Sequence, residues 1–133
     1  MFEVTKEIRF CYGHRLLNYD GKCKHLHGHN GRAVITLARP TLDALGMVTD
    51  FSEIKRVIGG WIESHLDHRM LLHKDDPAVP ALMEQNEPIF LMDVNPTAEN
   101  IAKIIFEFAA GKGIPVVEVR LWETDTSSAT YRK

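Results

Sequence analysis

A short histidine-rich stretch carries the residue types that bind transition-metal cations. Residues 23–29 (CKHLHGH) hold three of the seven histidines and one of the two cysteines of the chain. Imidazole nitrogen and thiolate sulfur are the usual side-chain ligands of zinc. If the stretch is extended, His27 and His29 point to the same face with their Cα atoms about 6.6 Å apart. Both rings can then reach one ion at about 2.0 to 2.1 Å.

A third ligand must come from elsewhere, because an extended chain places His25 about 13 Å from His29. We expect it to be His14, which follows a first strand that should pair beside the strand after the histidine-rich stretch. Three neutral imidazoles leave the ion its full charge and one free position, which suits a Lewis acid. The alternatives are a closed structural site with Cys23 as fourth ligand, or histidines with only capping and surface roles.

Three further positions could carry chemistry. Cys23 lies close enough to His27 to approach the ion without binding it, and a nearby cation favours the thiolate as a base or nucleophile. In Asp67-His68 a carboxylate can orient an imidazole as a proton relay, although such neighbours also occur as plain surface pairs. Glu123 falls on the apolar face at a strand end, where an unpaired charge is costly. It therefore needs a partner or a ligand.

The elements that position these groups follow from hydrophobic periodicity. Five segments have the alternation or the short apolar runs of strands: 1–11, 31–39, 89–92, 116–123 and 128–132. Two have helical spacing: 50–65, with Asp50 as its cap and Glu53 completing a capping box, and 96–111. Residues 15–30 are expected to form a long loop, and 73–88 to be irregular. Two amphipathic helices on one side of an antiparallel sheet make an α+β architecture.

Composition narrows the class of protein. With 133 residues, 44% of them apolar, the chain is expected to form one domain with its own core. A net charge of -2 without a basic block gives no sign of nucleic-acid binding. No apolar run approaches 18 residues and no charged-then-apolar segment opens the chain, so no membrane span or export signal is indicated. We therefore expect a cytoplasmic protein whose two cysteines are reduced.

Several short motifs occur in a fixed order: residues 10–14 (FCYGH), Cys23 with 27–29 (HGH), 46–51 (GMVTDF), 66–68 (LDH), 96–100 (PTAEN) and Glu123-Thr124. Together, over essentially the whole chain, they resemble the 6-pyruvoyl-tetrahydropterin synthase and 6-carboxytetrahydropterin synthase family. The resemblance implies one pterin synthase-like domain, residues 1–133, with the tunnelling fold: a four-stranded antiparallel sheet with two helices packed on one face. It also implies a homohexamer, a dimer of trimers, with active sites at subunit interfaces.

By position, the resemblance assigns roles to nine residues. They are the zinc ligands His14, His27 and His29, the catalytic residues Cys23, Asp67 and His68, and the pterin-binding residues Glu123, Thr97 and Glu99. The Asp67-His68 pair would come from a neighbouring subunit. Glu123 would accept two hydrogen bonds from the guanidine-like edge of the pterin, a bidentate geometry that suits a carboxylate.

The close spacing of Cys23 and His27 resembles the bacterial carboxy enzymes of the queuosine pathway. The implied reaction is zinc-dependent conversion of 7,8-dihydroneopterin triphosphate to 6-carboxy-5,6,7,8-tetrahydropterin, with loss of triphosphate and acetaldehyde. One alternative is a 6-pyruvoyl-tetrahydropterin synthase, which only eliminates triphosphate, and another is a non-catalytic paralogue that binds zinc and pterin. A zinc hydrolase of another fold is disfavoured, because no carboxylate base stands near the histidine pair.

Overall fold

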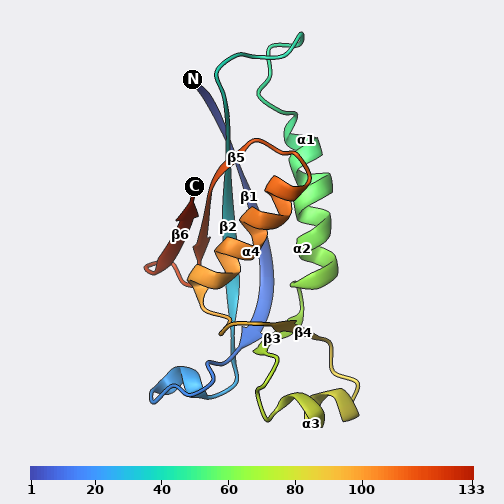
Figure 1. Cartoon of the computed structure of the whole chain (residues 1–133), viewed down its shortest axis with the longest axis vertical. Coiled ribbons are helices and arrows are strands. Elements are labelled where there is room, and N and C mark those ends of the chain that lie inside the picture. Colours follow the sequence, from blue (N-terminus) through green and yellow to red (C-terminus); the bar gives the residue numbers. More distant parts are fainter.

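Two long strands run the length of the molecule and carry the residues of interest at one end. The computed structural model describes residues 1–133, and its strands are β1 (Phe2–His14), β2 (His27–Arg39), β3 (Arg69–His73), β4 (Ile89–Met92), β5 (Val116–Trp122) and β6 (Ser128–Arg132). Strands β1 and β2 pair antiparallel from end to end. Both are longer than predicted, and β2 begins inside the expected loop. The histidine-rich stretch is thus extended from His27 onward (Figure 1).

All strands belong to one mixed sheet, in the order β4-β3-β1-β2-β5-β6. The expectation of a four-stranded antiparallel sheet is wrong in its count: β1, β2, β5 and β6 are antiparallel, but β3 and β4 extend the sheet as parallel strands. Strand β3 escaped prediction because Leu71 and Leu72 are both fully buried. A strand that is covered on both faces lacks the alternation by which strands are recognised.

The helical segments are α1 (Phe51–Ile54), η2 (Lys55–Gly59), α2 (Gly60–His65), α3 (Val79–Glu84), α4 (Ala98–Gly111) and the 3-10 turn η1 (Lys22–Lys24). The first three form one continuous helix with a π-helical middle, immediately before Gly60. Asp50 caps it as predicted, accepting a hydrogen bond from the Ser52 N–H at 2.8 Å. The predicted capping box is wrong, because the Glu53 carboxylate binds the Arg56 guanidinium instead.

Both long helices lie on the same face of the sheet (Figure 1). The first buries Ile54, Ile58 and Ile62, and α4 buries Ile101 and Ile105. These side chains join the inward-facing residues of the sheet in one continuous apolar cluster. Burial of each such side chain contributes about 1.5 to 3 kcal/mol. The cluster therefore fixes the strands, and with them the strand ends that carry the histidines.

The loop after β1 is tied to two distant segments. The Arg15 guanidinium donates to the buried carboxylate of Asp76, and this pairing holds the pKa of Asp76 below its ordinary value. The backbone of Leu17 is bound by the side chain of Asn95. The cysteines, Cys11 and Cys23, are free thiols. No helix has both the length and the apolar character needed to cross a membrane.

Candidate metal centre

Pairing of β1 with β2 gathers three histidines at one end of the sheet. His14 lies directly opposite His27, and His29 lies opposite Tyr12, two residues along each strand. The three imidazoles offer ligand atoms that all lie within 4.8 Å of one another. The prediction that His14 joins His27 and His29 is thereby confirmed as a matter of geometry. The converging donors are three imidazoles and no thiol.

Backbone carbonyls orient two of the three rings. His14 Nδ1 lies 2.6 Å from the carbonyl oxygen of Pro96, and His27 Nδ1 lies 2.7 Å from that of His25. A carbonyl oxygen only accepts, so in each ring Nδ1 carries the hydrogen and Nε2 keeps a free lone pair. Metal-binding histidines are usually held in this way, with one nitrogen donating to an outer partner and the other facing the ion.

The ring spacing matches what a tetrahedral ion requires. His14 Nε2 and His29 Nε2 lie 3.2 Å apart. Two nitrogens at about 2.0 to 2.1 Å from a tetrahedral zinc ion would be separated by about 3.3 to 3.4 Å. His27 and His29 are only partly buried, so the fourth position of such an ion would face an opening. The donor set thus fits a divalent cation with three protein ligands, the arrangement of catalytic centres.

Burial keeps His14 available as a ligand. Its side chain is 3% exposed. Burial lowers the pKa of His14 below its ordinary value and outweighs the opposing hydrogen bond to Pro96 and the charge of Glu123. The neutral imidazole that a metal requires is therefore the favoured form near neutral pH.

Glu123 lies beside the histidines, just beyond the end of β5. One carboxylate oxygen accepts a hydrogen bond from the Tyr12 hydroxyl at 3.2 Å and lies 3.7 Å from His14 Nε2. The other lies 3.9 Å from His29 Nε2. The prediction that Glu123 faces inward and needs a partner is confirmed. The partner itself, Tyr12, was missed, although it shares the strand parity of Phe10 and His14.

Tyr12 acts as a donor to Glu123 at all ordinary pH values. Its side chain is buried, and burial together with the nearby Glu123 charge raises the pKa of Tyr12. Its ring also contacts the rings of His14 and His29, with centroids 5.3 and 5.6 Å apart. Tyr12 therefore links the histidines and the carboxylate in one packed group.

The proposed relay pair, Asp67 and His68, lies at the free edge of β1 and outside the three-histidine cluster. Asp67 accepts from the Cys11 N–H at 2.9 Å, and the His68 N–H donates to the Cys11 carbonyl at 2.6 Å. His68 Nδ1 lies 2.9 Å from the second Asp67 oxygen, and the His68 side chain is 77% exposed. The pair is thus fixed to the sheet while its imidazole faces solvent.

Two further features describe how this pair is held. His68 has a φ of 58°, in the left-handed region that is unfavourable for residues with a Cβ. Such strain persists where the surroundings enforce it, commonly at functional sites. Burial raises the pKa of Asp67, but hydrogen bonds from Cys11 and His68 outweigh it and hold that pKa below its ordinary value. The carboxylate is therefore ionised and orients the imidazole.

The remaining predicted residues lie around this end of the sheet without joining the cluster. Cys23 is half-buried in η1, and its carbonyl accepts from the Leu16 N–H at 2.9 Å. The Thr97 hydroxyl accepts from the Asn100 N–H and caps α4. Glu99 is exposed in the first turn of that helix. In this chain, then, Thr97 has a structural duty, and Glu99 makes no hydrogen bond to the histidines.

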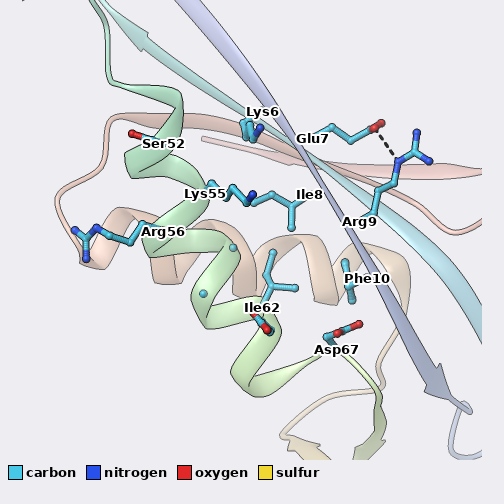
Figure 2. A pocket seen from close by; sticks show the side chains of 13 residues that line it. Lys6, Glu7, Ile8, Arg9, Phe10, Ser52, Lys55, Arg56, Ile62 and Asp67 are labelled. Carbon is cyan, nitrogen blue, oxygen red and sulfur yellow. Dashed lines mark hydrogen bonds and ion pairs between the residues drawn. The ribbon is translucent and has the colours of Figure 1, made fainter.

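A groove of about 670 Å³ lies between β1 and the first long helix. Figure 2 shows Lys6 and Lys55 entering it from these two elements, with Asp67 at its far end. No histidine of the cluster lines it. This groove is therefore separate from the metal donors and reaches the relay pair only through Asp67.

Comparison with known proteins covers nearly the whole chain. The family model of 6-pyruvoyl tetrahydropterin synthase matches residues 3–133. The chain belongs to this family. A 6-carboxy-5,6,7,8-tetrahydropterin synthase from Rickettsia felis is 38% identical over 131 residues, which are 93% of this chain and 95% of the relative.

Solved structures share the fold of this chain. An uncharacterized protein from Wolinella succinogenes has a TM-score of 0.86 and 27% identity, over 99% of this chain and 98% of that one. The 6-pyruvoyl tetrahydropterin synthase of Caenorhabditis elegans has a TM-score of 0.73 and 23% identity, over 99% and 95%. The second likeness supports the fold alone.

As a member of the pterin synthase family, the chain has its chemical groups divided between two places. The inner face holds the three imidazoles and Glu123, whereas the free edge of β1 holds the Asp67-His68 pair. Strand β1 contributes to both places, since it carries His14 and its Cys11 backbone binds Asp67 and His68.

We expect the purified protein to contain zinc, bound by His14, His27 and His29. His27→Ala should lose it on dialysis, because two imidazoles hold zinc far more weakly than three. Cys23→Ala should keep the metal, since the thiol stands outside the converging donors. Elemental analysis of the three proteins by mass spectrometry measures this. Loss of zinc from Cys23→Ala would instead indicate a closed structural site.

Proposed function

We propose that this protein is a zinc-dependent lyase that converts 7,8-dihydroneopterin triphosphate and one water molecule to 6-carboxy-5,6,7,8-tetrahydropterin, releasing triphosphate and acetaldehyde. The observation that carries the proposal is the convergence of three imidazoles beside an inward carboxylate, Glu123. Relatives with 30–38% identity over most of the chain are 6-carboxy-5,6,7,8-tetrahydropterin synthases, which supports the choice of product. We place the activity in the cytoplasm, where its free thiols would stay reduced.

Zinc would supply Lewis-acid polarisation of the oxygens on the substrate side chain. Cys23 is proposed to remove a proton from the adjacent carbon, because η1 holds it on the loop that precedes the β2 histidines. His68 would carry protons, with Asp67 stabilising its charged form. Proton transfers of this kind contribute about 10² to 10⁴ in rate when the groups are positioned.

Glu123 is proposed to bind the pterin ring. In the free protein its carboxylate has a single hydrogen-bond donor from a side chain, Tyr12, at 3.2 Å. A carboxylate can accept up to about four hydrogen bonds, so acceptor capacity remains. The amino-pyrimidine edge of a pterin offers two adjacent N–H donors that match a bidentate carboxylate. Thr97 and Glu99, near the start of α4, are proposed to contribute to the same pocket, with Thr97 acting while it caps the helix.

We further propose that the active site is completed by a second copy of the chain in a homohexamer, a dimer of trimers. The relay pair lies at the edge of β1 and outside the converging imidazoles, an arrangement that supports a site to which a second chain contributes its own pair. Strand β3 pairs only with Tyr12, Gly13 and His14, which leaves the rest of that edge of β1 open. The outer edge of β6 is open as well. Open edges of this kind are templates for pairing between chains.

The reaction is tested by incubating the zinc-loaded protein with 7,8-dihydroneopterin triphosphate and analysing the products by mass spectrometry. We expect 6-carboxy-5,6,7,8-tetrahydropterin and acetaldehyde. Cys23→Ala should reduce kcat by a factor of about 10² or more, with its zinc retained, because it removes a base and no ligand. A 6-pyruvoyl product would point to the shorter reaction. Pterin binding without turnover would identify a non-catalytic binder.

Glu123→Gln should weaken binding of 6-carboxypterin by about 2 to 3 kcal/mol, because the substituted amide opposes one donor of the ligand with another donor. Isothermal titration of both proteins measures this, and zinc content should not change. Glu118→Gln serves as the matched control, since Glu118 lies within β5, five residues before Glu123, and pairs with Arg132. Equal affinities for wild type and Glu123→Gln would leave Glu123 with only a structural partnership.

Sharing of the site between subunits can be tested by mixing two inactive variants. Cys23→Ala and His68→Ala should each be inactive alone, because every site then lacks one group. If each site takes Cys23 from one chain and His68 from another, random reassembly should restore roughly a quarter of the wild-type rate. Reassembly of each variant with itself is the control. A mixture that stays inactive although mass spectrometry shows mixed oligomers would contradict the shared site.

A further inference from the structure

Asn95, which none of the roles above uses, binds the backbone beyond the end of β1. Its side-chain oxygen accepts from the Leu17 N–H at 2.8 Å, and its side-chain nitrogen donates to the Leu17 carbonyl at 3.0 Å. A primary amide carries both a donor and an acceptor, so it can satisfy both backbone groups of one residue. We call this pair of hydrogen bonds the Asn95 clamp.

Asn95 is itself held by the start of α4. Its carbonyl accepts from the Thr97 N–H at 2.8 Å and from the Asn100 side chain at 2.9 Å. Asn100 lies in the first turn of α4, which packs into the core through Ile101. The clamp therefore joins the loop after β1 to a rigid part of the fold.

The residue next to Asn95 touches a metal donor. The carbonyl of buried Pro96 accepts the Nδ1 hydrogen of His14 at 2.6 Å. Leu17 follows His14 by three residues. The clamp therefore completes a closed set of contacts, which runs from His14 to Leu17 along the chain, from Leu17 to Asn95 through the clamp, and from Pro96 back to His14. In the same loop, the Leu16 N–H donates to the Cys23 carbonyl at 2.9 Å. The two residues of the clamp are thus chain neighbours of residues that bind His14 and Cys23: Asn95 precedes Pro96, and Leu17 follows Leu16.

We propose that Asn95 is a positioning residue of the metal centre. Its clamp holds the chain after His14 against the start of α4, and this keeps the His14 ring against the Pro96 carbonyl and so fixes its orientation and tautomer. The inference rests on the proposed zinc site. Without the clamp, the loop of residues 15–26 gains conformational freedom, and that freedom must be lost again when the ring meets an ion. Outer partners of metal-binding histidines typically affect metal affinity by about 10- to 100-fold.

Loss of the clamp is not expected to unfold the protein. The loop keeps its second tie, the Arg15 ion pair with Asp76, and α4 keeps its Thr97 cap and its buried face. A role confined to stability would therefore be visible only as a lower Tm. A positioning role changes properties of the metal site that a stability defect elsewhere does not.

The test compares wild type with Asn95→Ala and with Asn95→Asp, which keeps an acceptor for the Leu17 N–H but sets an oxygen against the Leu17 carbonyl. Zinc affinity is measured by competition with a chelator, and the tautomer of His14 in the metal-free protein by ¹⁵N NMR. We expect zinc affinity to fall by about 10-fold or more in both variants. We also expect His14 to change from a single Nδ1–H form to a mixture. Ile58→Val, a core change under the first long helix, is the control: it should lower Tm and leave both readouts at wild-type values.

The outcomes separate the two levels of the proposal. A wild-type protein that binds no zinc through the three histidines overturns the proposed function, and the inference with it. A wild type that binds zinc, together with Asn95 variants of unchanged zinc affinity and unchanged His14 tautomer, overturns the inference alone. So does the Ile58→Val control, if it weakens zinc binding as much as Asn95→Ala does.

Discussion

The register of β1 against β2 determines whether this chain has a metal centre at all. His14 opposite His27 and Tyr12 opposite His29 put four aromatic rings on one face of the sheet. Because side chains alternate along a strand, a slip of one residue would send one set to the opposite face and separate the imidazoles. Packing holds the register. Gly31 is one of its fixed points, since a Cβ there would lie 2.9 Å from a ring carbon of Tyr12.

Strand β1 contributes to both the histidine cluster and the Asp67-His68 pair, because its inner face is buried and its edge near Cys11 is open. The inner face is covered by helices, so His14 is buried there and its pKa is lowered, which favours the neutral form that a metal ligand needs. The edge near Cys11 has unpaired backbone groups, and Asp67 and His68 bind them. This attachment holds His68 in a left-handed conformation with its ring in solvent. An exposed, oriented imidazole contributes little to the stability of one chain, and in the proposed oligomer a second chain would supply its partner.

Local sequence patterns predicted the three metal-donor histidines, but they did not predict the long-range contacts. Alternation placed His27 and His29 on one face, and strand pairing brought in His14. The start of β2 was missed because its first residues are polar or glycine, and pairing with β1 extends the strand regardless. The Glu53 capping box failed because Arg56 offers an oppositely charged partner one turn away. Tyr12 as partner of Glu123, and Asn95 as partner of Leu17, join positions 111 and 78 residues apart. No local pattern encodes such contacts.

Charge balance connects the buried histidines to the choice of substrate. Burial lowers the pKa of His14 and raises that of Tyr12, so both side chains favour their neutral forms beside Glu123. A protonated His14 would instead pair with Glu123 across 3.7 Å and close the cluster to cations. Burial opposes this pairing, because it lowers the pKa of His14. A divalent ion held by the three histidines would add two positive charges beside Glu123, since bound cations are often the largest local charges. Such a site would attract a polyphosphate ester, and the uncharged pterin edge would be left for the proposed hydrogen bonds to Glu123.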